Sequence, residues 1–198
     1  MRKSNLVVKI SQLEGFSSPK VSLEQYLTPP DLAADLIFTA FMQGDIEGKH
    51  VVDLGAGTGI LGVAAELLGA KVTGVEKDPD ALEIARKNAE KTGSDIEFVE
   101  DDIGIIQEKF DTVVMNPPFS VHSDEGMKFV EKAFSISDAV YMIANRSSRA
   151  SIKDFAEESN HEIQAVEEFK ISLPPTFGFH TEENRETPVD LIITRRLN

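Results

Sequence analysis

Short strand-type runs alternate with helix-type runs along most of this 198-residue chain, and this alternation limits the fold more than any other feature. Runs rich in apolar and β-branched residues occur at residues 50–54, 71–75, 96–99, 111–115, 139–144, 162–171 and 189–195. Helix-type runs separate most of them, at residues 59–68, 79–91, 125–134 and 148–158. Such alternation is typical of a parallel sheet with helices on both faces. We therefore expect an α/β fold built on a seven-stranded, mostly parallel sheet.

The residues before the first expected strand form an N-terminal helical arm. Thr28 is a typical N-cap residue, so we expect a helix to begin after it, with Pro29 at the first helical position. Gly44 is the expected stop of that helix. The length of the chain is ordinary for one domain. We therefore expect a single domain, with the arm at residues 1–44 and a Rossmann-like core at residues 45–198.

The composition excludes several kinds of site. The chain has no cysteine, so disulfides, thiolate zinc sites and cysteine nucleophiles are ruled out. Its four histidines lack the spacing of metal ligands, and we expect no metal site. A net charge of −14 argues against nonspecific nucleic-acid binding by the surface as a whole. No signal peptide or membrane-length apolar run is visible, so we expect a cytoplasmic protein with no membrane partner.

The stretch DLGAGTGILG, residues 53–62, begins at the end of the first expected strand. Gly55, Gly57 and Gly59 allow a sharp turn and a close approach to a ligand, beside the unpaired N–H groups of the next helix. Asp53 stands just before this loop, where a carboxylate repels phosphate and suits a cationic amino-acid group. That favours S-adenosylmethionine over a dinucleotide as the cofactor. The alternative is a glycine-rich turn that binds no ligand.

Acidic residues stand at the ends of the second and third expected strands. Glu76 lies about twenty residues beyond the glycine loop, where an acid can accept hydrogen bonds from both hydroxyls of an adenosine ribose. Asp102 is placed to accept a hydrogen bond from the adenine amino group, and Ile103 to offer its backbone and an apolar wall. The alternative for both acids is a solvated charge at a strand end. Ligands of such sheets bind beyond the carboxyl ends of the strands, so we expect these residues to share a site with the glycine loop.

The fourth expected strand ends abruptly in the sequence NPPF, residues 116–119. Asn116 offers an amide oxygen and Pro117 a carbonyl oxygen, and two such acceptors can hold the two hydrogens of an exocyclic amino group. Such an amine is a poor nucleophile because its lone pair is conjugated with the ring, and hydrogen bonds that draw its hydrogens out of the ring plane localise that lone pair. Pro118 stiffens the turn, and Phe119 can stack on a planar base. The alternative is a proline-rich turn that only ends the strand.

Together these motifs resemble class I S-adenosylmethionine-dependent methyltransferases with an Asn-Pro-Pro-aromatic motif, which methylate adenine N6, guanine N2 or the side-chain nitrogen of glutamine. The closer resemblance is to the methyltransferase-like protein 5 family of small-subunit rRNA adenine-N6 methyltransferases, which has archaeal relatives. It covers nearly the whole chain and includes LEQYLTP, VVDLGAGTGILG, DALEIARKNAE, DTVVMNPPF, AVY, FGFH and VDLI. The resemblance implies a class I methyltransferase Rossmann-like fold and S-adenosylmethionine-dependent methylation of an adenine in small-subunit rRNA.

The same resemblance assigns individual residues to the site. It implies cofactor contacts from Gln25, Thr28, Gly55, Thr58, Ile60, Glu76, Asp102 and Ile103. It also implies that residues 116–119 hold the target amino group and stack on its base. An N-terminal arm that folds over the cofactor would exclude water from the site.

Contacts to RNA have a weaker signal in this sequence. The loop that is often basic in the family reads TEENRE here, residues 181–186. Phosphate contacts supply much of the affinity for RNA, and we expect them from Arg146, Arg149 and Lys153. The resemblance also implies a small zinc-binding activator protein as a partner, which would add positive surface.

Other functions stay open from the sequence. Guanine-N2 methylation of RNA and glutamine-N5 methylation of a protein are compatible with the NPPF motif, although LEQYLTP and FGFH favour adenine. A nicotinamide-dependent oxidoreductase would account for the glycine loop and leave the NPPF motif unexplained. A noncatalytic RNA-binding scaffold would have no need of intact cofactor and acceptor motifs.

Overall fold

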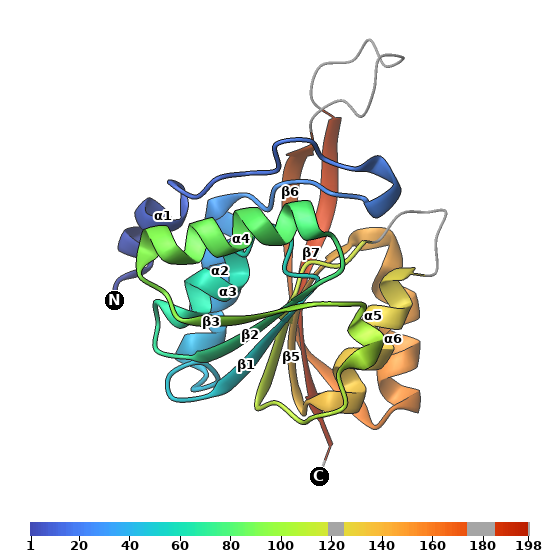
Figure 1. The fold of residues 1–198 in the computed structure, drawn as a ribbon. Helices are drawn as coiled ribbons and strands as arrows, with labels where there is room; N and C mark the ends of the chain where they lie inside the picture. The colour runs from blue at the N-terminus through green and yellow to red at the C-terminus, as the bar shows by residue number, and fades with distance from the viewer. Residues whose placement is uncertain (119–124, 174–184, 198) are drawn as a thin grey trace.

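A seven-stranded sheet forms the centre of the fold within the described residues, which in this computed structural model are 1–118, 125–173 and 185–197 (Figure 1). The strands are β1 His50–Leu54, β2 Lys71–Glu76, β3 Ile96–Glu100, β4 Thr112–Met115, β5 Ala139–Asn145, β6 His161–Leu173 and β7 Arg185–Arg196. They lie in the order β3-β2-β1-β4-β5-β7-β6, and β7 runs antiparallel to both of its neighbours. The prediction of a seven-stranded, mostly parallel sheet is confirmed.

Helices cover both faces of this sheet (Figure 1). One face carries α1 Lys3–Ile10, α2 Pro30–Met42, α3 Ile60–Glu66 and α4 Pro79–Thr92, and the other carries α5 Glu125–Ile136 and α6 Arg149–Glu158. Short 3-10 turns lie at η1 Val21–Leu23, η2 Ile103–Ile105 and η3 Arg146–Ser148. Two apolar clusters fill the layers, one between the sheet and α1–α3 and one between the sheet and α5–α6.

The central strands are apolar along almost their whole length because helices bury both of their faces. All four residues of β4 are buried, as are the last four of β1. A strand that is covered on both faces carries a continuous apolar run in place of an alternating one. The exception in β1 is Asp53, a carboxylate that is only 1% exposed.

The start of α2 differs from the prediction. The helix begins at Pro30, and Pro29 occupies the N-cap position with an extended backbone, ψ 135°. A residue that precedes a proline is driven out of the helical region by the proline ring, and this excludes Pro29 from the first helical turn. Thr28 therefore caps no helix, and its hydroxyl is instead bonded to Asn116. The predictions of Thr28 as N-cap and of Pro29 as the first helical residue are wrong.

The last two strands are longer than predicted. Their antiparallel register extends from His161 opposite Arg196 to Leu173 opposite Arg185. The residue pairs beyond the predicted strand ends lie mostly in a segment whose polar sequence predicts a loop. Backbone hydrogen bonds between antiparallel strands do not depend on apolar side chains, so the two strands continue to pair there.

The strand order reverses direction between β1 and β4. From β1 the sheet grows first through β2 to β3, and the chain then returns to place β4 on the other side of β1. Leu54 of β1 and Met115 of β4 lie in register at this point. In open α/β sheets, the crevice beyond the strand ends at such a reversal is the usual ligand site. No helix in the described part of the chain has the length and apolar character that a membrane crossing needs.

Candidate active site

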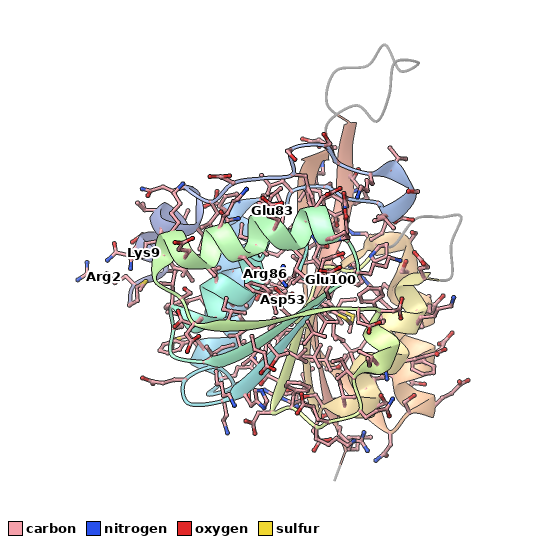
Figure 2. The ribbon with its side chains drawn as sticks, viewed as in Figure 1. Arg2, Lys9, Asp53, Glu83, Arg86 and Glu100 are labelled. Atoms are coloured by element: carbon pink, nitrogen blue, oxygen red, sulfur yellow. The ribbon has the colours of Figure 1, made fainter. Side chains whose placement is uncertain are left out.

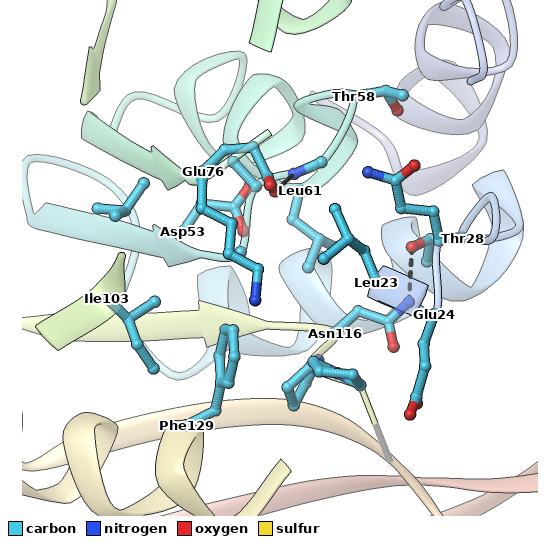
Figure 3. A pocket seen from close by; sticks show the side chains of 18 of the residues that line it. Leu23, Glu24, Thr28, Asp53, Thr58, Leu61, Glu76, Ile103, Asn116 and Phe129 are labelled. Carbon is cyan, nitrogen blue, oxygen red and sulfur yellow. Dashed lines mark hydrogen bonds between the residues drawn. The ribbon is translucent and has the colours of Figure 1, made fainter. Parts of the chain in front are cut away.

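A cavity of about 220 Å³ opens beyond the carboxyl ends of β1, β2 and β4 (Figure 3). Most of the site residues predicted from the sequence line it: Gln25, Thr28, Asp53, Gly55, Gly57, Thr58, Ile60, Glu76, Asp102, Ile103, Asn116, Pro117 and Pro118. Gly59 forms the N-cap of α3, behind this lining. Phe119 lies outside the described residues. The fold thus gathers the glycine loop, the strand-end acids and the acceptor motif around one space.

The glycine loop requires its glycines for conformation and for space. Gly55 has a φ of +71°, and a Cβ at this residue would lie 2.8 Å from a ring carbon of Phe129. Gly57 has a φ of +55°, and a Cβ there would lie 3.1 Å from Phe16. The N–H groups of Gly55 and Ala56 both donate to the carbonyl oxygen of Val75, at 2.9 Å each. At Gly55 and Gly57 the loop therefore presents backbone without a side chain to the cavity.

Glu76 ends β2 with its carboxylate held by two backbone groups. The Gly57 N–H donates to Oε2 at 2.8 Å, and the Asp78 N–H donates to Oε1 at 2.9 Å. The residue is 9% exposed and borders the cavity. A carboxylate offers about four acceptor positions, so each oxygen keeps capacity for a further donor. The arrangement suits a ligand with two neighbouring hydroxyl groups.

Asp53 lies deep in the molecule beneath the glycine loop (Figures 2 and 3). Burial raises the pKa of its carboxyl to about 7, the Gly62 N–H that donates to Oδ2 at 2.8 Å opposes this rise, and the charge of Glu76 adds to it. The group is therefore balanced between its neutral and charged forms near neutral pH. A cation in the cavity would favour the charged form.

Asp102 and Ile103 border the cavity where η2 begins. Asp102 Oδ1 accepts a hydrogen bond of 3.0 Å from the Gly104 N–H and so caps this turn. The other carboxylate oxygen has no hydrogen bond in the described structure. The side chain of Ile103 is half-buried and borders the cavity together with the ring of Phe129 (Figure 3).

Asn116 lies at the end of β4 with both ends of its amide bonded to the arm. The hydroxyl of Tyr26 donates to Oδ1 at 2.7 Å, and Nδ2 donates to Thr28 Oγ1 at 2.8 Å (Figure 3 shows the second bond). Pro117 is buried and Pro118 half-buried beside it. The arm therefore reaches the acceptor motif directly.

The same arm is fixed to the cap of α4. Gln25 Nε2 donates to Asp78 Oδ2 at 2.6 Å, and Gln25 Oε1 accepts from the Lys20 N–H at 2.8 Å. Lys20 Nζ also pairs with Asp78, at 2.6 Å. Although partial burial acts most strongly on Asp78 and raises its pKa, the hydrogen bonds from Lys20 and Gln25 together lower that pKa below its ordinary value. The charged form of Asp78 thus holds the arm in place.

Several residues around the cavity were not found by sequence reasoning. Tyr26 is the most prominent, and its only signal is its place between Gln25 and Thr28 in the LEQYLTP stretch. Phe16 and Phe129 border the cavity from the arm and from α5. An aromatic residue on an amphipathic helix carries no signal that separates it from ordinary core residues.

The predicted RNA contacts lie away from this cavity and are bonded to acids. Arg146 and Arg149 both pair with Asp190, whose side chain is fully buried, at 3.2 and 2.7 Å, and both also pair with Glu168. Lys153 lies 3.8 Å from Glu157 on the same helix. None of the three borders the cavity within the described residues. Within those residues there is also no group of three or more His, Asp or Glu side chains that could hold a metal ion.

Comparisons with known proteins agree over nearly the whole chain. The sequence model of the methyltransferase small domain matches residues 28–150. The chain is 35% identical over 202 residues to rRNA N(6)-adenosine-methyltransferase METTL5 of Danio rerio, covering 97% of this chain and 98% of that protein. It is 39% identical over 189 residues to rRNA N(6)-adenosine-methyltransferase Mettl5 of Drosophila melanogaster, covering 90% of this chain and 89% of that one. A crystal structure of a candidate RNA methyltransferase from Pyrococcus horikoshii matches with a TM-score of 0.92 and 37% identity, covering 100% and 99% of the two chains.

Proposed function

Because this chain belongs to the methyltransferase small domain family and is an S-adenosylmethionine-dependent methyltransferase, we propose that it methylates N6 of an adenine in small-subunit ribosomal RNA. The observation that carries the proposal is the position of Asn116. Its amide borders the same cavity as Glu76 and the glycine loop. The residue proposed to accept from the amino group and the residue proposed to accept from the ribose hydroxyls thus border one space, which supports methyl transfer from cofactor to amine there.

The residues that border the cavity fit S-adenosylmethionine. Glu76 would hold the ribose hydroxyls, Asp102 and Ile103 would hold the adenine ring, and Gln25, Thr28, Thr58 and Ile60 would complete the wall. The glycine loop leaves backbone close to the ligand, and a Cβ on Gly55 would collide with Phe129. Buried Asp53 suits the positive charges of this ligand. When bound, the cofactor supplies a methyl group on a sulfonium centre, which is strongly electrophilic.

Asn116 and Pro117 would act on the acceptor. Asn116 Oδ1 and the Pro117 carbonyl oxygen accept the two hydrogens of the adenine amino group and draw them out of the ring plane. The nitrogen lone pair then points toward the incoming methyl group, so that orientation and electrostatics suffice and no strong base is required. N6 would gain the methyl group as the carbon–sulfur bond breaks and leaves a neutral thioether, and N6 would lose one proton to water. Phe119, which lies outside the described residues, is proposed to stack on the base.

The RNA must present an adenine that has left its helix. A base that is stacked in a helix cannot enter the cavity beyond the carboxyl ends of the strands. The target is therefore proposed to be an extruded or single-stranded adenine. The relatives from Danio rerio and Drosophila melanogaster are named for adenosine in rRNA, which supports this choice over guanine and over a protein glutamine.

Part of the positive surface for RNA is proposed to come from a partner. The chain carries a net charge of −14, and Arg146 and Arg149 already pair with Asp190 and Glu168. A small zinc-binding activator protein would supply further phosphate contacts. Arg146, Arg149 and Lys153 remain proposed contacts to RNA phosphates. The phosphates would compete with Asp190 and Glu168 for the two arginines and with Glu157 for Lys153.

The proposal is tested with methyl-labelled S-adenosylmethionine and three purified acceptors: small-subunit RNA from cells that lack the protein, free nucleosides, and a release factor. We expect label in RNA alone, recovered as N6-methyladenosine after digestion. Label recovered as N2-methylguanosine would show that the target base is guanine and that the adenine assignment is wrong. Label on the release factor alone would contradict an RNA substrate.

A further inference from the structure

The amide of Asn116 is held at both ends by hydroxyl groups of the N-terminal arm. Tyr26 Oη lies 2.7 Å from Asn116 Oδ1, and Thr28 Oγ1 lies 2.8 Å from Asn116 Nδ2. Tyr26 and Thr28 are close together in the sequence, whereas Asn116 lies 90 residues after Tyr26, and all three border the cavity. Asn116 follows directly on β4, the middle strand of the sheet, while its two partners come from the segment that leads into α2.

This arrangement affects the capacity of Asn116 as an acceptor. An amide oxygen has two lone pairs, and the Tyr26 hydroxyl occupies one of them, so one is left for a hydrogen of a bound amino group. Without the arm, the amide could rotate about its last torsion, which has a broad energy profile. With the arm in place, the two hydrogen bonds fix the plane of the Asn116 amide and the direction in which its oxygen points.

We propose that Tyr26 is a positioning residue, which aims the amide oxygen of Asn116 at the acceptor amino group. The inference rests on the proposed function, since it assumes that Asn116 holds that amino group. Tyr26 itself does not need to touch the substrate. Its effect passes through the single hydrogen bond to Asn116.

The ring and the hydroxyl of Tyr26 have separate tasks. The half-buried ring packs against the apolar cluster that joins α1–α3 to the sheet. The hydroxyl points to Asn116, and burial raises its pKa to about 12, so it stays protonated and able to donate at any physiological pH. A phenylalanine would keep the packing and remove only the hydrogen bond.

The arm is also anchored at its other end, where Gln25 and Lys20 bind Asp78 on the cap of α4. Asp78 in turn donates its N–H to Glu76, the predicted ribose acceptor. Residues 20–28 therefore connect the cofactor side of the cavity with the acceptor side. Tyr26 is the point at which this connection reaches the acceptor amide.

The test compares Tyr26→Phe with wild type in steady-state methylation of RNA. We expect kcat to fall roughly tenfold, the effect of one hydrogen bond of ordinary strength. The KM values for RNA and for the cofactor should stay within about twofold of wild type, and the melting temperature should stay within a few degrees of it. This split separates positioning from a merely structural role, which would lower stability or raise KM.

Tyr141→Phe is the matched control. Its hydroxyl donates to Asp45 Oδ2 at 2.5 Å, in the loop before β1 and at the opposite edge of the sheet from the cavity. Like Tyr26→Phe, the Tyr141→Phe substitution removes one buried tyrosine hydroxyl. We expect it to lower the melting temperature and to leave kcat unchanged. Equal losses of kcat in both variants would overturn the inference, because the effect would then follow from stability.

Asn116→Ala separates this inference from the proposed function. If Asn116→Ala is inactive while Tyr26→Phe keeps the wild-type kcat, the positioning role of Tyr26 is wrong and the acceptor role of Asn116 stands. If Asn116→Ala keeps full activity, the acceptor role itself is wrong and the role of Tyr26 falls with it. Loss in both variants, with the larger loss in Asn116→Ala, supports the inference.

Discussion

Gln25 Nε2 donates a hydrogen bond of 2.6 Å to Asp78 Oδ2, and this bond joins the N-terminal arm to the cap of α4. Gln25 Oε1 also accepts from the Lys20 N–H, so one side chain holds the arm at two points. Because α4 follows directly on the strand that ends in Glu76, the arm is fixed beside the predicted ribose site. The closure of the cavity should therefore depend on Gln25.

Gln25→Ala should loosen the arm without unfolding the core. It removes two hydrogen bonds, one of them to a carboxylate, and we expect amide hydrogen exchange of residues 20–28 to become about tenfold faster or more. Affinity for S-adenosylmethionine should fall, and the melting temperature should change little. Hydrogen-exchange mass spectrometry checks this, with the exposed Gln12→Ala as the matched control. Unchanged exchange over residues 20–28 would show that Gln25 does not hold the arm.

Glu76→Gln should weaken cofactor binding. The change removes the negative charge and one of the oxygens that accept hydrogen bonds, and hydrogen bonds to charged groups contribute about 1.5–3 kcal/mol each. We expect the Kd for S-adenosylmethionine to rise roughly 10- to 100-fold in isothermal titration calorimetry.

Glu100→Gln is the control for this measurement. Glu100 is the register partner of Glu76 on β3, and its exposed side chain is not among those that border the cavity. It should bind the cofactor as wild type does. Equal affinities in all three proteins would exclude Glu76 from the cofactor site.

Asp53→Asn should stabilise the cofactor-free protein more at high pH than at low pH. Burial raises the pKa of Asp53 to about 7, whereas an aspartate in an unfolded chain titrates near 3.9. Between these values the folded state binds more protons than the unfolded state, so stability from this group is present at low pH and falls as pH rises toward 7. Asp53→Asn has no titrating carboxyl at this position, so its free energy of unfolding does not decrease for this reason as the pH rises.

Urea unfolding at pH 5 and pH 8 measures this difference. The quantity of interest is the free energy of unfolding of Asp53→Asn minus that of wild type. This difference should be about 2 kcal/mol larger at pH 8 than at pH 5, since each pKa unit corresponds to about 1.4 kcal/mol. The other carboxylates cancel in the comparison. A difference between the two proteins that is the same at both pH values would mean that Asp53 titrates normally.

Gly55→Ala should cost both stability and activity. Its φ of +71° disfavours any side chain, and the added Cβ would lie 2.8 Å from Phe129. Gly93→Ala is the control for conformation alone, since Gly93 has the same φ with no atom within 4 Å of the added Cβ. We expect a loss of about 1 kcal/mol for Gly93→Ala and roughly 2–4 kcal/mol for Gly55→Ala, with methylation reduced only in the second. Equal losses would show that the contact with Phe129 adds no strain.

The alternation of strands and helices was enough to predict the parallel core of the sheet, because buried parallel strands carry a strong and continuous apolar signal. The ends of strands meet at one edge, which is why Gly55, Glu76 and Asn116 could be expected near one another from their places in the chain. Thr28 was assigned as a helix cap from residue preference alone. The double proline that follows moved the helix start by one residue.

The contacts between distant segments were beyond sequence reasoning. The arm has no periodic pattern between residues 20 and 28, so nothing in the sequence connects Tyr26 with Asn116. Arg149 looked free for phosphate, yet it pairs with Asp190, about forty residues later in the chain. Such pairs arise only when separate elements pack together, and a single sequence carries no record of them.

Mass spectrometry of small-subunit rRNA from cells that lack this protein measures whether it forms N6-methyladenosine there and whether Asn116 is needed. The cells are complemented with wild type or with Asn116→Ala, and the nucleosides are quantified after digestion. We expect one N6-methyladenosine to be missing in the deletion, restored by wild type and not restored by Asn116→Ala. An unchanged N6-methyladenosine content in the deletion, or full restoration by Asn116→Ala, would contradict the proposed function.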